Sequence, residues 1–415
     1  MNKKFNSKLF RITTIPASLK ILLKGQLRFM NSNGFEVIAV SSNEPVLYEL
    51  QKEENVQVYP VKMTRKITPF DDLAALWNLY KILKFEQPEI VHTHTPKAGI
   101  VGMLAAKLAG VPIRMHTVAG LPLMEASGLK RKVLDFVEKL TYSSATQVYP
   151  NSKGLYDFIL QNKYTSAKKL KVIGRGSSNG IDTTYFSKEQ ITRENQTQLK
   201  KELNIQPNDF VFVFVGRLVG DKGINELVEA FQKLEIRDQK LGISSEPQIS
   251  SLQSPISNSQ SRIPKLLLVG PLESELDPLK EETLKEIKTN PNIISVGFQK
   301  DVRPYFAIAN ALVFPSYREG FPNVVMQAGA MELPSIVSDI NGCNEIIVEG
   351  ENGTIIPVKN AEAITVAMQK LMEDKDYYLS LKNNARPMIQ SRYEQQVVWN
   401  ALLKEYELLI SKLTN

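Results

Sequence analysis

Short apolar runs of strand length alternate with amphipathic helical stretches along this chain, and the alternation occurs twice. Residues 71–85, for example, carry leucines at the spacing of one helix face. Strands that are apolar along their whole length are typical of parallel sheets covered by helices on both faces. The first set of predicted strands is 9–15, 35–41, 56–61, 89–93, 113–117 and 146–150.

A Gly/Ser-rich segment, GRGSSNGID at 174–182, separates the two sets and predicts a hinge. With 415 residues the chain is long enough for two cores. We therefore predict two α/β domains, residues 1–180 and residues 181–393. The second set of predicted strands is 210–215, 265–269, 293–296, 311–314 and 335–338.

Two further segments stand apart from this alternation. Residues 243–263 are rich in Ser and Gln and predict a disordered surface insertion. Residues 394–415 carry apolar side chains at helical spacing and predict a long terminal helix with one apolar face.

Composition limits the functions that fit. No run reaches the about 18 apolar residues of a membrane span, and the N-terminus lacks the features of a signal peptide. The only cysteine, Cys343, excludes an internal disulfide and fits a reducing cytoplasm. Three histidines and one cysteine make a metal site of protein ligands a poor fit.

The charge is uneven along the chain. Residues 1–180 hold 26 Lys or Arg against 13 Asp or Glu, and the rest hold 25 against 31. The basic first half predicts an anionic partner, either a phosphorylated substrate or an anionic membrane surface. We see no recognition helix, zinc finger or aromatic-basic platform, so nucleic acid is not expected. A merely lysine-rich domain remains the alternative.

Ligands of open parallel sheets bind beyond the carboxyl ends of the strands. After the run 210–215 come Gly216, Arg217, Lys222 and Gly223. Glycines let backbone N–H groups approach a phosphate, and the two cations add fixed charge, so this loop predicts a diphosphate site. A solvated basic turn is the alternative.

The loop after residues 311–314 has the same placement. Glu319 precedes a predicted helix that begins near Asn323, and Pro322 suits the first turn of that helix. A carboxylate at this point can accept hydrogen bonds from sugar hydroxyls. The alternative is a solvated glutamate that the helix dipole stabilises.

Three histidines end strands of the first half, where an imidazole can bond a phosphate or sugar oxygen. His92 fits a structural role best, whereas for His94 and His116 a structural and a binding role remain open.

Five segments together resemble the retaining family 4 glycosyltransferases, and above all the bacterial branch that extends undecaprenyl-diphosphate-linked sugars in capsule or glycan assembly. They are HTHTPKAGIVG at 92–102, SSNGID at 177–182, GRLVGDKG at 216–223, EGFPNVVMQA at 319–328 and NGCNE at 341–345. The resemblance covers nearly the whole chain and implies the GT-B fold, two Rossmann-like doubly wound domains facing across a cleft. It also implies that the terminal helix packs back on the first domain.

The resemblance implies roles for individual residues. Arg217 and Lys222 match the pair that neutralises the leaving diphosphate, Glu319 matches the acid that orients the donor sugar, and His116 lies near the transferred sugar. His94 and Lys97 would belong to the acceptor or phosphate side. Residues expected to bind the donor are Gly216, Gly223, Gly320, Phe321, Pro322, Asn323 and Gln327.

The function that the resemblance implies is retaining, metal-independent transfer of a hexose or N-acetylhexosamine. The donor would be a UDP-sugar, the acceptor a lipid-linked (undecaprenyl-diphosphate) sugar, and no cofactor would be needed. We expect a cytoplasmic enzyme held peripherally on the inner face of the membrane by Lys130, Arg131, Lys132 and the apolar residues 121–124. No protein partner is identifiable.

Two departures from the family pattern leave alternatives open. Gln327 stands where the family usually has Glu, and TTIPASL at 13–19 lacks the paired glycines of many relatives. A glutamine keeps an acceptor oxygen, so we interpret Gln327 as an adjusted contact. Two alternative functions remain: a sugar-nucleotide 2-epimerase of the same fold, and a nucleotide-sugar-binding protein without turnover.

Overall fold

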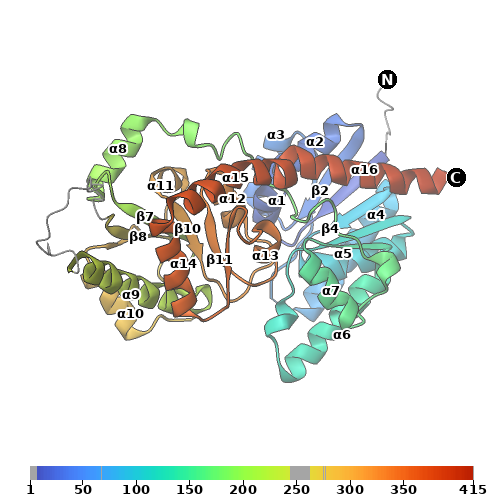
Figure 1. Cartoon of the computed structure of the whole chain (residues 1–415). Helices are drawn as coiled ribbons and strands as arrows, with labels where there is room; N and C mark the ends of the chain where they lie inside the picture. The colour runs from blue at the N-terminus through green and yellow to red at the C-terminus, as the bar shows by residue number, and fades with distance from the viewer. Residues whose placement is uncertain (1–6, 67, 244–261, 274, 276, 415) are drawn as a thin grey trace, which may run out of the picture. The chain divides into compact units, whose positions relative to one another are not determined.

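The computed structural model describes residues 7–66, 68–243, 262–273, 275 and 277–414. The chain divides into two compact units (Figure 1). Unit 1 comprises Met1–Gly180 and Arg392–Asn415, and unit 2 comprises Ile181–Ser391. Most of the insertion expected at 243–263 lies outside the described residues.

Unit 1 is built on a parallel six-stranded sheet with the order β3-β2-β1-β4-β5-β6. This is the doubly wound order of a Rossmann-like fold. All six strands expected in the first half are present, although the first ends at Ile12 because Pro16 opens a helix. The strands are β1 (Ser7–Ile12), β2 (Phe35–Ser41), β3 (Gln57–Pro60), β4 (Ile90–Thr93), β5 (Ile113–Val118) and β6 (Gln147–Pro150).

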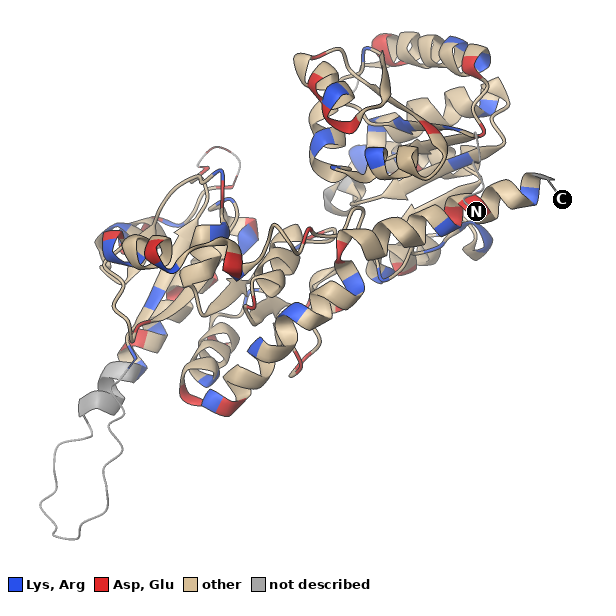
Figure 2. Cartoon of the chain, turned by 90° about the horizontal axis from the view of Figure 1, so that it is seen from above, with Lys and Arg blue, Asp and Glu red and all other residues tan. Residues whose placement is uncertain are grey.

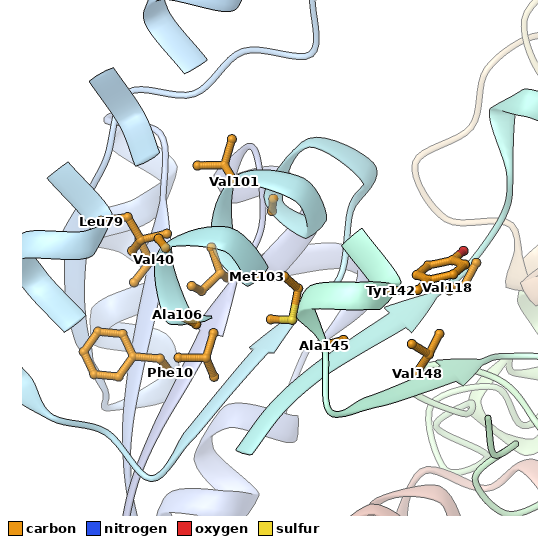
Figure 3. Packing of buried hydrophobic residues seen from close by; sticks show 14 of the residues in the cluster. Phe10, Val40, Leu79, Val101, Met103, Ala106, Val118, Tyr142, Ala145 and Val148 are labelled. Carbon is orange, nitrogen blue, oxygen red and sulfur yellow. The ribbon is translucent and has the colours of Figure 1, made fainter. Parts of the chain in front are cut away.

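One face of this sheet carries α4 (Pro69–Glu86), α5 (Pro96–Ala109) and α6 (Gly128–Ser144). Proline opens both α4 and α5, where a missing N–H costs nothing. Leu79 of α4 and Met103 of α5 pack with Phe10 of β1 in one buried core (Figure 3). This packing fixes which sides of the three helices face outward.

The other face of the sheet carries α1 (Pro16–Leu22), α2 (Gln26–Ser32), α3 (Pro45–Glu54) and the terminal helix α16 (Gln395–Thr414). Leu402 and Tyr406 of α16 are buried in the same core as Leu9 and Phe35. The rings of Tyr406 and Phe35 are 5.6 Å apart. The terminal helix α16 therefore packs on the same sheet as β1, the first strand of the chain. The remaining helix of unit 1 is α7 (Lys153–Gln161).

Unit 2 has a second parallel six-stranded sheet, with the order β12-β11-β10-β7-β8-β9. The five predicted strands are confirmed, and β12 was not predicted because it is only four residues in a Gly- and Glu-rich stretch. Its strands are β7 (Phe210–Val215), β8 (Pro264–Val269), β9 (Ile293–Ser295), β10 (Ala311–Phe314), β11 (Ser335–Ser338) and β12 (Gly353–Ile356). Its helices are α8 (Arg193–Glu202), α9 (Ile224–Ile243), α10 (Glu281–Thr289), α11 (Arg303–Ile308), α12 (Asn323–Ala330), α13 (Cys343–Ile346), α14 (Ala361–Glu373) and α15 (Lys375–Tyr393), which reaches into unit 1.

The predicted fold class, two Rossmann-like α/β units with doubly wound parallel sheets, is confirmed. In the part of the chain that the structure describes, every helix is too short or too polar to cross a bilayer.

Candidate functional site

Two neighbouring strands of unit 2 bring the predicted donor loops together. β10 pairs with β7, so the loops that follow them leave the same edge of the sheet. The Tyr317 amide donates to the Asp221 carbonyl at 2.9 Å. Gly223 has φ +70°, and a Cβ there would lie 2.2 Å from the Pro315 carbonyl oxygen. Only glycine permits this approach, so Gly223 allows the loop after β7 to pack directly against the loop after β10.

Lys222 and Glu319 meet where these loops touch. The Lys222 Nζ lies 2.5 Å from the Glu319 Oε1, and both side chains are largely buried, with 15% and 18% exposed. The Ser316 hydroxyl lies 3.1 Å from the same carboxylate oxygen. The edge of the sheet thus holds one cation and one carboxylate in fixed positions, each neutralising the other.

A third loop holds the backbone next to Glu319. The Asn341 Nδ2 donates to the carbonyl of Glu319 at 3.1 Å and to that of Gly320 at 2.6 Å. Gly342 lies so close that a Cβ there would be 2.6 Å from the Gly320 carbonyl oxygen. The loop after β11 therefore positions the segment that leads into α12.

The remaining predicted donor residues lie along this segment. Phe321 and Pro322 precede α12, Asn323 begins it, and Gln327 is half-buried one turn further on. The first N–H groups of a helix have no partner within the helix and favour anionic groups. Glu319 and the start of α12 together can hold hydroxyl and phosphate groups of one ligand.

Arg217 lies on the rim of this region. It follows Gly216 at the end of β7, its side chain is 44% exposed, and its Nη1 lies 3.1 Å from Glu273 in the loop after β8. An exposed ion pair of this kind is worth at most about 1 kcal/mol. Arg217 can therefore exchange Glu273 for an anionic ligand at little cost.

In unit 1 the three histidines lie at the carboxyl ends of β4 and β5, and all are buried. Burial lowers the pKa of each below its usual value, and that of His116 falls to about 4. All three are therefore uncharged at neutral pH. Both ring nitrogens of His92 have partners at 2.7 Å, Tyr406 and Thr117, which fits the structural role expected for it.

His116 is held by its neighbours on β4 and α5. Its Nδ1 lies 2.7 Å from the Thr93 Oγ1. Gly99 of α5 leaves room for the ring, because a Cβ at that position would be 2.6 Å from the His116 Cε1. The first turn of α5 is thus shaped around the imidazole.

A buried arginine was missed by the sequence analysis. Arg11 of β1 is fully buried and donates from its Nε to the His94 Nε2 at 3.0 Å and from its Nη2 to the Gln26 Oε1 at 2.5 Å. Because the His94 Nε2 accepts, the proton of this neutral ring is on Nδ1. His94 and Gln26 line a cavity with Asn151 and Ser178. The one signal in the sequence was a cation inside the apolar run 9–15.

Lys97 lies at the start of α5, apart from this cavity. Its Nζ lies 2.6 Å and 2.8 Å from the two carboxylate oxygens of Asp72, and its side chain is largely buried. The ion pair links the first turns of α4 and α5. The place on the acceptor or phosphate side that was expected for Lys97 stays a prediction.

The residues expected at a membrane are divided between surface and core. Lys130 and Lys132 are exposed on α6, whereas the Arg131 Nε donates to Asp135 at 2.7 Å. The expectation of an apolar surface at 121–124 is wrong for Leu121 and Leu123. Both are buried in the core of unit 1, because a short 3₁₀ turn points them inward.

Comparison with known proteins adds to this geometry. The family model described as "Glycosyl transferases group 1" matches residues 195–388, and the model "Glycosyl transferase 4-like domain" matches residues 25–176. Among the described residues, no group of three or more His, Cys, Asp and Glu side chains could hold a metal ion.

Similar proteins cover the same span. "Capsular polysaccharide biosynthesis glycosyltransferase CapM" of Staphylococcus aureus is 31% identical over 407 residues, 98% of each chain. An Escherichia coli protein, "UDP-Gal:alpha-D-GlcNAc-diphosphoundecaprenol alpha-1,3-galactosyltransferase", is 28% identical over 77% of this chain and 76% of its own. The crystal structure of a glycosyltransferase from Rickettsia africae has a TM-score of 0.77 at 18% identity, over 98% of this chain and 99% of its own.

Proposed function

This chain belongs to the family 4 (group 1) glycosyltransferases, and on that premise we propose that it transfers a hexose or N-acetylhexosamine from a UDP-sugar to an undecaprenyl-diphosphate-linked sugar. The transfer would retain the anomeric configuration and need no metal. It would serve the synthesis of a cell-surface polysaccharide at the inner face of the cytoplasmic membrane. The names of the Staphylococcus and Escherichia relatives support the acceptor class and the pathway type.

The observation that carries the proposal is the Lys222–Glu319 pair at the carboxyl ends of adjacent strands. Breaking a sugar–phosphate bond builds negative charge on the diphosphate. Fixed cations and N–H groups that are already in place stabilise this charge without reorganising. Lys222 and Arg217 would supply the cations and the start of α12 the N–H groups, in place of a metal ion. Glu319 would accept hydrogen bonds from the donor sugar.

Unit 1 would bind the acceptor. We assign His116 a hydrogen bond to the transferred sugar, because its imidazole is uncharged and fixed by Thr93. With a pKa of about 4 it is a poor base for a sugar hydroxyl at neutral pH. The oxygen of the leaving phosphate would therefore help to take the acceptor proton during attack on the same face of the sugar.

Gln327 would contact the ribose of the donor. Replacing a charged hydrogen-bond acceptor by a neutral one costs at most about 1.5–3 kcal/mol, and the amide recovers part of this through its own oxygen. We therefore treat the substitution as a change in donor affinity and not as the loss of the reaction.

The test is release of nucleoside diphosphate from a panel of nucleotide sugars, with and without a diphosphate-linked lipid sugar, in the presence of EDTA. Acceptor-dependent release together with a heavier lipid product would establish the transferase and identify its donor. Conversion of the donor without acceptor would show an epimerase instead. Donor binding without either product would show a binding protein without turnover.

A further inference from the structure

Two helices of unit 1 expose large apolar side chains in rows. On α4, Phe70 is 90% exposed, Leu73 65%, Trp77 53% and Phe85 83%. A second row, on α6, consists of Leu129, Val133 and Phe136, also exposed. We call these seven residues the α4–α6 face.

Both rows point away from the same core. α4 turns Ala75, Leu79 and Leu83 inward, and Phe70 and Trp77 lie on the opposite side of the helix at a period of 3.6 residues. α4 and α6 each pack against α5 on one face of the sheet. Figure 3 shows Leu79 turned toward the strands. The two rows therefore belong to one side of a single compact unit.

This exposure exceeds what a solvated surface normally carries. The largest apolar patch of a typical soluble monomer is about 300–600 Å² and is often functional. An aromatic side chain presents about 150–250 Å², and three aromatic residues of α4 are more than half exposed. The exposed apolar residues of α4 alone are therefore of the size at which a patch is often functional, which favours a partner for this surface.

The charges around the α4–α6 face are mostly positive. Lys81 and Lys84 are exposed on α4, and Lys130, Lys132 and Lys139 are exposed on α6. Figure 2 shows the Lys and Arg residues of the chain in blue and the Asp and Glu residues in red. The nearby acids are already engaged: Asp71 pairs with Lys62, and Asp135 pairs with Arg131. A second copy of the chain would bring like charges together. An anionic lipid surface matches both the lysines and the interfacial Trp and Phe side chains.

We propose that the α4–α6 face docks on an anionic bilayer. The aromatic row of α4 enters the interface between headgroups and acyl chains, and the lysines of α6 provide the electrostatic attraction. The sequence analysis expected the apolar contact with the membrane at residues 121–124, whereas here it is made by the aromatic residues of α4. The inference rests on the proposed function, since the acceptor would be presented by the same bilayer.

The test is co-sedimentation of the full chain with vesicles of phosphatidylglycerol and phosphatidylcholine, compared with vesicles of phosphatidylcholine alone. We expect binding only to the anionic vesicles. The double variant Phe70→Ser/Trp77→Ser should lower the partition coefficient about tenfold or more. The triple variant Lys130→Gln/Lys132→Gln/Lys139→Gln should lower it by up to about 100-fold at low salt. The matched control is Val366→Ser, which removes a half-exposed apolar side chain from α14 of unit 2 and should leave binding unchanged.

Tryptophan fluorescence tests whether the α4–α6 face contacts the bilayer, because Trp77 belongs to this face. The chain has two tryptophans, and Trp399 is half-buried and donates from its indole N–H to Asn179 at 2.7 Å. Anionic vesicles should shift the emission to the blue in the native chain but not in Trp77→Phe, which retains an aromatic ring. Absence of vesicle binding, or binding that the α4 and α6 variants leave unchanged, would overturn the proposal. A shift that depends on protein concentration without vesicles would assign the face to a second copy instead.

Failure of the docking and failure of the transferase are separable. Turnover is measured with a short-chain, water-soluble acceptor, for which the α4 and α6 variants should keep native rates. Vesicle binding without turnover would leave the docking intact and remove the proposed reaction.

Discussion

Lys222→Ala is the most direct test of how the proposed reaction is driven. The Lys222 Nζ lies 2.5 Å from Glu319 and 3.5 Å from the Ser316 hydroxyl, with its side chain 15% exposed. The substitution removes a fixed cation from the point where charge would develop on the diphosphate. Loss of one contact of this type costs about 2.7–4 kcal/mol of transition-state stabilisation. We therefore expect kcat to fall by at least about 100-fold.

The same substitution leaves Glu319 without its cation, and this second effect must be separated from the first. Breaking a fully buried pair costs about 3–5 kcal/mol, but Glu319 is 18% exposed and keeps the Ser316 hydroxyl. We expect a loss of only about 1 kcal/mol in the free energy of unfolding, since solvent screens the remaining charge. Urea unfolding measures this loss independently of turnover.

The assay is steady-state release of nucleoside diphosphate at saturating donor and acceptor, measured for Lys222→Ala, Glu319→Ala and the double variant. If Lys222 acts only by holding Glu319, removing it from the Glu319→Ala chain would have no further effect. The matched control is Arg237→Ala, which breaks an exposed ion pair with Glu362 in the same unit and should leave kcat unchanged. Turnover of Lys222→Ala within threefold of the native rate would refute the assignment.

Three further predictions concern other parts of the chain. Gln327→Glu should leave kcat within about an order of magnitude, and a gain of several orders in the same assay would show that the native site is crippled. Gly99→Ala places a Cβ 2.6 Å from the His116 ring and should destabilise the fold by about 1–3 kcal/mol while reducing turnover. Native turnover of Gly99→Ala would contradict the role proposed for the His116 ring. Acidification from pH 7 to pH 5 should lower the free energy of unfolding, because burial lowers the pKa of all three histidines in the folded state and the unfolded chain then binds more protons. The pKa of about 4 for His116 corresponds to a loss of about 2 kcal/mol at pH 5, partly offset by Glu138, whose pKa burial raises to about 6. Urea unfolding at both pH values measures the change, and equal or higher stability at pH 5 would contradict it.

The strands and the loops that carry Lys222 and Glu319 could be predicted because their signals are local. The run FVFVFV can only be a buried strand, and β7 has those bounds in the structure. The rule that parallel strands end at one edge then brings the loops of Lys222 and Glu319 to the same side. What the rule cannot give is that β10 is the neighbour of β7, because strand order depends on crossovers and not on local pattern.

The partners and burial of individual side chains could not be predicted, because they depend on residues elsewhere in the chain. The sequence did not indicate that Lys97, expected on the acceptor or phosphate side, pairs with Asp72, 25 residues earlier. Leu121 and Leu123 were expected on an apolar surface together with the cluster 130–132, yet both are buried in the core of unit 1, at a 3₁₀ turn. Local pattern identifies the chemistry of a side chain, but its direction follows only from packing.

The charged groups of each unit bear on the proposed reaction. In unit 2, Lys222 and Arg217 are paired with carboxylates that a donor diphosphate can replace. In unit 1, His94 and His116 are kept uncharged by burial, and His94 is also bonded to the fixed cation of Arg11. With a pKa of about 4, His116 would be a weak base for the proton of the acceptor hydroxyl. In the proposed reaction the leaving phosphate, which Lys222 would stabilise, is then the stronger candidate for accepting that proton, and this would link departure of the leaving group to attack on the same face of the sugar.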